Sequence, residues 1–171
     1  MIAMIVSIIY LIISFLFESV MSNIFPATFG NVSCFSTIYT IIAFVIIYPY
    51  FANEKKYYIL IIIFGCLFDI LYTSTILINL VLFIIVAIVI KVLNNLISDN
   101  IFMTNVMSIV CIIVYHLLSF IILNLTTSGV YGISLLLEII THSIIMTVIY
   151  CSISYFVIKF IYNKLEIKQI K

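Results

Sequence analysis

Charged residues are scarce in this 171-residue chain, where Asp, Glu, Lys and Arg together make up 8% of the total. Arginine and tryptophan are absent, and there are only 2 prolines and 4 glycines. A soluble domain of this length needs far more polar surface to cover its core, so the low charge excludes that class. Since 67% of the residues are apolar, the sequence predicts an integral membrane protein.

The cysteines do not predict a disulfide framework or a metal site. They lie far apart, with no C-x-x-C pair and no metal-ligand spacing, at Cys34, Cys66, Cys111 and Cys151. We expect them to be small apolar side chains within helices.

Long apolar runs predict membrane-spanning helices, because they lack the ten-residue alternation of a membrane β-barrel. A bilayer core of about 30 Å needs about 20 helical residues. The N-terminus lacks a Lys-rich leader and a convincing cleavage site, so its apolar run is predicted to be a retained span. The sequence thus predicts an all-α, six-helix transmembrane bundle, a single domain over residues 1–171. The predicted spans are approximately residues 2–21, 34–51, 57–72, 76–93, 105–125 and 134–162.

The third and fourth spans are separated only by a short polar stretch. Residues 57–93 are almost continuously apolar and would extend about 55 Å as one helix, which is too long for one crossing. Thr73, Ser74 and Thr75 are the most polar point within it, and hydroxyl side chains cap helix ends. We therefore predict a tight hairpin there.

The lysines predict the orientation of the chain. All 7 basic residues are Lys, and each lies at or after the end of an even-numbered predicted span. Because cytoplasmic loops hold the excess of Lys, both termini are predicted to face the cytoplasm. Tyrosines flank the inner loop after the second span, as in an interfacial aromatic belt. The lysines are Lys55, Lys56, Lys91, Lys159, Lys164, Lys168 and Lys171.

Five ionisable residues fall in or near the predicted spans, where each costs several kcal/mol unless it is partnered or hydrated. They are Glu18, Asp69, His116, Glu138 and His142. The predicted topology places them mainly in the outer half of the bundle, on four helices. One interpretation is a polar chamber for a ligand or proton, or a metal site of Glu138, His142 and His116. The other is interhelical hydrogen bonding, favoured for Glu138 and His142 because they lack the spacing of a zinc motif such as H-E-x-x-H.

Residues 64–74 read Phe-Gly-Cys-Leu-Phe-Asp-Ile-Leu-Tyr-Thr-Ser. Gly65 and Asp69 occupy one helix face, so the glycine would let a neighbouring backbone approach while the aspartate meets a partner group. The segment resembles the third span and following turn of MreD, the rod-shape-determining membrane protein family. Members typically show a Gly, an Asp four residues later, and an aromatic-Thr-Ser-like turn. That turn corresponds here to Tyr72, Thr73 and Ser74.

The likeness extends beyond this segment. Phe17-Glu18-Ser19 resembles the acidic-Ser ending of the first span in the family, and the length, span count and short inner loop before the third span also fit. Two positions depart from the family pattern. Leu77 stands near a place where a Gly is usual, and Glu138 lies in a region where relatives often carry Pro.

The resemblance implies a non-enzymatic scaffold in the bacterial plasma membrane, within the complex that elongates the cell wall. It implies MreC as the direct partner, and the MreB filament and the peptidoglycan synthases RodA and penicillin-binding protein as further associates. It also implies a fold similar to the substrate-binding subunits of energy-coupling-factor vitamin transporters. No cofactor, catalytic residue, bound metal or nucleic-acid partner is expected.

Two other functions remain open from the sequence. A vitamin-binding subunit of such a transporter would share six spans and an outward-facing polar pocket. Near the outer ends of the spans the chain offers Asn23, Asn31, Asn79 and Asn124 for that purpose. A membrane enzyme is less well supported, because no familiar set of acid, base, nucleophile or metal ligands is present.

Overall fold

A computed structural model describes residues 2–24, 37–51, 54–73, 77–96, 100–126 and 132–167. These residues form helices and short connections, without a strand, which confirms the predicted all-α class. Five helices are long and apolar enough to cross a membrane: α1, α3 with its π-helical end, α4, α5 and α6. The elements are α1 (Ile2–Ile24), α2 (Tyr39–Ile47), the 3₁₀ turn η1 (Tyr48–Tyr50), α3 (Glu54–Phe68), the π-helical turn η2 (Asp69–Thr73), α4 (Ile78–Leu96), α5 (Ile101–Thr126) and α6 (Ile133–Lys164).

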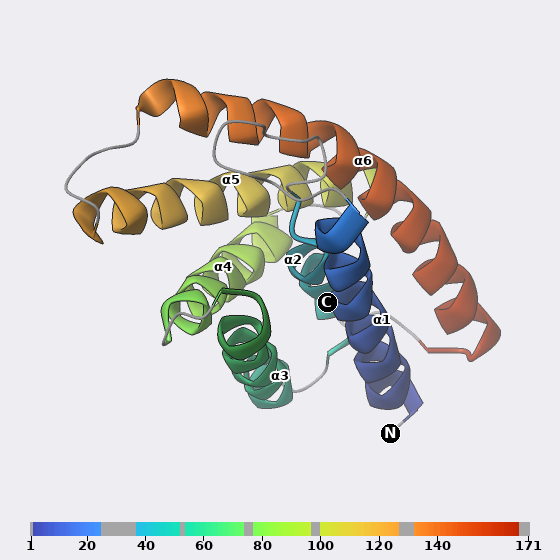
Figure 1. The fold of residues 1–171 in the computed structure, drawn as a ribbon. Coiled ribbons are helices and arrows are strands. Elements are labelled where there is room, and N and C mark those ends of the chain that lie inside the picture. The colour runs from blue at the N-terminus through green and yellow to red at the C-terminus, as the bar shows by residue number, and fades with distance from the viewer. Residues whose placement is uncertain are drawn as a thin grey trace.

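The short helix α2 lies in the middle of the molecule, surrounded by the long helices (Figure 1). All nine of its residues are buried, and it packs against α1, α4, α5 and α6. A span over residues 34–51 was expected, but α2 is only about 14 Å long before η1 follows. After α2, Pro49 in η1 lacks a backbone N–H and cannot continue the α-helix. Before α2, Thr37 and Ile38 are not helical. Because α2 is surrounded by protein and not by lipid, it does not need the length of a membrane-spanning helix. Residues 34–36 lie outside the described residues.

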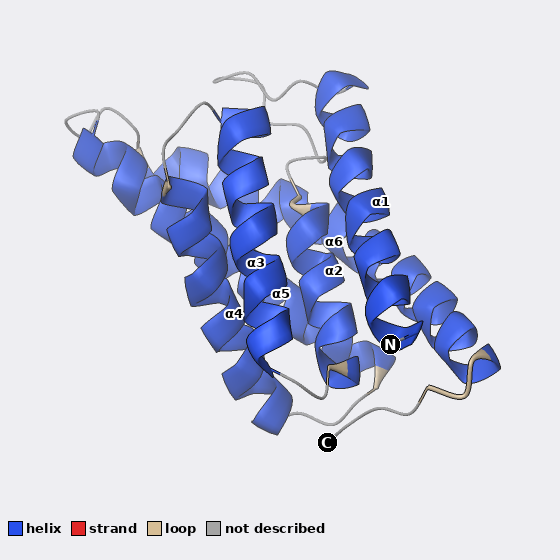
Figure 2. Ribbon diagram, turned by 90° about the horizontal axis from the view of Figure 1, so that it is seen from below, coloured by secondary structure: helices blue, strands red, loops and turns tan. Residues whose placement is uncertain are grey.

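Described lysines gather at one end of the bundle, which we call the lysine end. The start of α1 and the end of α6 both lie there (Figure 2), as do the start of α3 and the end of α4. The described lysines lie in these helix ends, at Lys55, Lys56, Lys91, Lys159 and Lys164.

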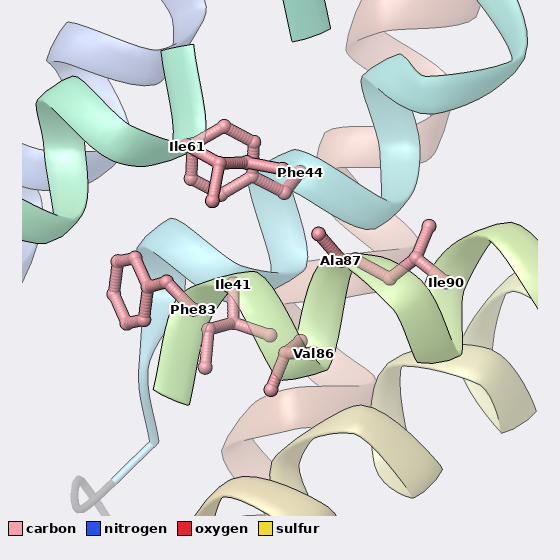
Figure 3. A pocket seen from close by; sticks show the side chains of 7 residues that line it. All are labelled: Ile41, Phe44, Ile61, Phe83, Val86, Ala87 and Ile90. Carbon is pink, nitrogen blue, oxygen red and sulfur yellow. The ribbon is translucent and has the colours of Figure 1, made fainter. Parts of the chain in front are cut away.

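The apolar centre is built where α2, α3 and α4 meet. Figure 3 shows seven side chains from these helices around a narrow pocket that has no room for a water molecule. The pocket is lined by Ile41, Phe44, Ile61, Phe83, Val86, Ala87 and Ile90. Aromatic rings join this centre to α1, since the Phe15 ring meets the rings of Phe64, Phe68 and Tyr72 edge to face at 4.9 to 6.4 Å.

Helix α6 is 32 residues long, about 48 Å, which is longer than a 30 Å hydrocarbon core. It bends part-way along its length (Figure 1). Hydroxyl groups of Thr141, Ser143 and Thr147 donate to carbonyls three or four residues earlier, and this back-bonding is a known cause of helix bending. At the lysine end the Tyr162 hydroxyl lies 2.6 Å from that of Ser7, which holds α6 against α1.

The break between the third and fourth helices contains a backbone conformation that favours glycine. Helix α3 passes into η2, which ends at Thr73, and α4 begins at Ile78. Leu77 has a φ of 62°, in the left-handed region. A side chain there costs about 1 to 2 kcal/mol relative to glycine, so the departure noted at this position carries a cost in stability.

Replacing Leu77 with glycine is therefore expected to stabilise the protein by about 1 kcal/mol, because the exposed Leu77 side chain loses little packing. Equilibrium unfolding in mixed micelles measures the change. The matched control is Val81→Gly, an exposed position inside α4, which should destabilise by about 1 kcal/mol. Equal losses for both variants would contradict the strain at Leu77.

Candidate functional site

Asp69 caps the beginning of α4 from the end of the preceding helix. Its Oδ1 accepts hydrogen bonds from the backbone N–H and the side-chain Nδ2 of Asn79, both at 3.0 Å. Its Oδ2 accepts one from the backbone N–H of Leu80 at 3.0 Å. These N–H groups belong to the first turn of α4, which has no partners for them within its own helix. The buried carboxyl group thus satisfies the positive end of α4 with both of its oxygens.

Gly65 brings α3 and α4 into close contact at the same place. A Cβ at Gly65 would lie 2.9 Å from the Cα of Leu80, a separation that real Cβ atoms essentially never show. Only glycine therefore lets Leu80 approach closely enough for its N–H to reach Asp69. The close backbone approach expected from the Gly65 and Asp69 spacing is present, and both residues act on the same turn of α4.

Asn79 extends this cluster to α5 and to the end of η2. Its Nδ2 also donates to the Thr73 hydroxyl at 2.9 Å. The Tyr115 hydroxyl donates to the Asn79 Oδ1 at 2.5 Å. The cluster therefore ties α3, α4 and α5 together in the interior, where a missing partner would cost the most.

Glu18 does for α2 what Asp69 does for α4. Its Oε2 accepts hydrogen bonds from the Thr40 hydroxyl at 2.7 Å and from the Thr40 backbone N–H at 3.3 Å. Thr40 lies in the first turn of α2, and the N-cap residue Ile38 offers no side-chain cap of its own. The buried Glu18 of α1 thus supplies the missing cap.

The two acids share one arrangement. Each follows a Leu-Phe pair, as Leu16-Phe17-Glu18 in α1 and Leu67-Phe68-Asp69 at the end of α3, and each caps the helix that comes next. Tyr115 of α5 reaches the Asp69 cap through its hydrogen bond to Asn79. The donors to these carboxyl oxygens come from the first turns of α2 and α4. The arrangement can therefore hold the starts of these two helices in place.

The other residues expected in the site have different environments. The Tyr72 hydroxyl donates to the Phe15 carbonyl at 2.7 Å and joins η2 to α1. Ser74 lies outside the described residues. Glu138 is exposed on α6, and His142 is half-buried one turn later.

His116 is half-buried on α5, with its ring 5.7 Å from that of Tyr115. Within the described parts of the chain, no three His, Cys, Asp or Glu side chains lie close enough to hold a metal ion. The candidate cluster of His116, Glu138 and His142 therefore does not form a three-ligand site there.

Sequence reasoning did not identify Thr40 and Tyr115 as partners of the acids, and it placed Asn79 only among the outer polar residues. A usable signal existed for two of them. Thr40 and Asn79 are each a polar residue in the first turn of the helix after the acid-bearing one. Tyr115 has no such signal, because it meets Asn79 across 36 positions of sequence.

Comparison with known proteins finds no match for this chain among protein-family models, curated proteins or solved structures. The resemblance to MreD therefore rests on the residues quoted for it, and the geometry above is the independent information about what those residues do.

The Glu18 cap can be measured with a double-mutant cycle of Glu18→Ala and Thr40→Val. We expect a coupling energy of about 1 kcal/mol, because the valine removes the hydroxyl donor and keeps the shape. The control cycle pairs Glu18→Ala with Thr104→Val, since the buried Thr104 hydroxyl bonds locally, to the carbonyl of Asn100 just before α5. Unfolding in mixed micelles should show no coupling for the control, and equal couplings in both cycles would contradict the cap.

Proposed function

We propose that this chain is a multi-spanning scaffold of the bacterial plasma membrane that acts in cell-wall elongation, as MreD proteins do, and that it binds an MreC-like protein through its membrane helices. The observation that carries the proposal is the role of the MreD-like residues. Gly65, Asp69 and Thr73 dock α4 onto α3, with three N–H groups bound to the Asp69 carboxyl. Residues that fix helices against one another suit a scaffold protein, which has to offer its partners a rigid surface within the membrane.

The proposed topology has six crossings, with both termini in the cytoplasm. Five long helices and the central α2 supply the crossings. The lysine end is the cytoplasmic end, because cytoplasmic segments hold the excess of Lys. Glu18 and Asp69 then cap helix starts on the outer side.

The vitamin-binding alternative receives no support from the pocket between α2, α3 and α4. All seven of its lining residues are apolar, so their side chains offer a vitamin no hydrogen bond. A polar ligand also needs a space larger than a water molecule, which this pocket lacks.

The test is co-purification in mild detergent of the tagged chain with the MreC-like bitopic protein encoded in the same genome. We expect a stable complex, and we expect the gene for this partner beside the gene for this chain. A tagged chain that purifies with a bound vitamin or with transporter ATPases, and without the bitopic protein, would overturn the proposal.

A further inference from the structure

One part of the molecule stands apart from the packed bundle. We call residues 116–126 of α5 and 132–142 of α6 the hairpin tip. Leu136 is its single buried residue, and every other residue of these two segments is exposed or half-buried. Helices α5 and α6 pack against each other, and Figures 1 and 2 show the tip reaching away from α1 and α2. The tip therefore presents membrane-facing surface that the rest of the described chain does not cover.

The surface of the tip differs chemically from the other outward faces. On α1 every exposed residue from Met4 to Met21 is Ile, Leu, Val or Met. On α3 and η2 every exposed residue between Lys56 and Thr73 is Ile or Leu. Such faces suit lipid. The tip instead carries an exposed carboxyl, three exposed hydroxyls, an amide and two imidazoles. They belong to Glu138, to Thr126, Ser134 and Thr141, to Asn124, and to His116 and His142.

The exposed polar groups of the tip accept hydrogen bonds. Among the described residues the Glu138 side chain has no hydrogen bond or ion pair, and its oxygens remain open as acceptors. The Thr141 hydroxyl already donates to the carbonyls of Leu137 and Glu138, so it too can only accept from outside. Membrane helices bind one another through such hydrogen bonds, because lipid cannot satisfy them.

Because these exposed groups accept hydrogen bonds, we propose that the Glu138 and Thr141 face of the hairpin tip binds a single transmembrane helix with complementary donors. That helix presents a donor side chain, Lys, Arg, Asn or Gln, at the same depth in the membrane. The inference rests on the proposed function, in which that helix is the membrane span of the MreC-like partner. It assigns the partner surface to α6, away from the apolar faces of α1 and α3.

Cysteine cross-linking tests the assignment in the full-length chain with its native cysteines replaced. Leu137→Cys lies on the exposed tip, and Ile63→Cys is the control on the exposed face of α3. Each variant is expressed with an MreC-like partner that carries single cysteines along its transmembrane helix. We expect disulfide cross-links from Leu137→Cys and none from Ile63→Cys.

A second measurement uses Glu138 itself. Glu138→Leu is expected to lower the amount of co-purified partner about tenfold, whereas Glu138→Gln, which keeps an acceptor oxygen, should retain most of it. Both variants should elute from size exclusion like the wild type. Cross-links from the α3 face alone, or full co-purification by Glu138→Leu, would overturn the surface and leave the proposed function standing. A wild-type chain that does not bind the partner would overturn the proposed function itself.

Discussion

Gly65→Val should destabilise the protein by about 3 kcal/mol or prevent its folding, the largest effect we expect from one substitution. Even a single Cβ at this position would lie 2.9 Å from the Cα of Leu80, and backbone cannot rotate away as a side chain can. Helices α3 and α4 must then separate, which also moves Leu80 away from Asp69. Thermal unfolding in mild detergent, with the yield of folded protein, measures the effect.

The matched control for Gly65 is Gly132→Ala. Gly132 is exposed and has a φ of −79° that any residue adopts. Among the described residues, a Cβ there would meet only the Ser134 hydroxyl, at 3.4 Å. We expect this change to alter stability by less than about 0.5 kcal/mol. A Gly65→Val protein as stable as the Gly132→Ala protein would show that α3 and α4 do not depend on the close approach.

Asp69→Ala is expected to cost about 3 kcal/mol, because it removes three hydrogen bonds and leaves the first turn of α4 without a cap. The midpoint of thermal unfolding should fall by about 10 °C. Asp69→Asn keeps one acceptor oxygen and should lose about half as much. Glu138→Ala, which removes an exposed acid, is the control and should change little.

Asp69 also offers a way to separate folding from partner binding. Under the proposed function, if Asp69 acts only through the cap, the loss of cell-wall elongation in cells should follow the loss of folded Asp69→Ala protein. A variant that stays folded in wild-type amounts and still fails to support elongation would assign Asp69 a role beyond the cap.

Apolar run lengths predicted the long helices well, because lipid imposes both length and composition on them. The expected span at residues 134–162 corresponds to α6 at Ile133–Lys164. The break was expected at residues 73–75, and η2 ends at Thr73 while α4 begins at Ile78. The same reasoning overestimated α2. Its residues are as apolar as any in the chain, but they face protein, so composition gives no information about its length.

The candidate site was predictable in part, for a similar reason. A glycine and an acid on one face of an apolar helix indicate a close neighbour and a polar partner, and Gly65 and Asp69 have both. Their counterpart Glu18 was identified as an acid in a span, but its partner Thr40 was not identified, although Thr40 is a polar residue in the first turn of the next helix. One interpretation placed the polar residues of α5 and α6 with the acids in an outer polar chamber, yet Glu138 lies on an exposed face because the hairpin tip leaves the bundle.

Maleimide labelling of intact cells tests the membrane topology most directly. In a chain without its native cysteines, Lys55→Cys at the lysine end and Ser134→Cys at the exposed start of α6 are treated with an impermeant reagent. We predict labelling of Ser134→Cys in intact cells, and of Lys55→Cys only after the membrane is permeabilised. Labelling of Lys55→Cys from outside, or of both positions from the same side, would contradict the six-crossing arrangement.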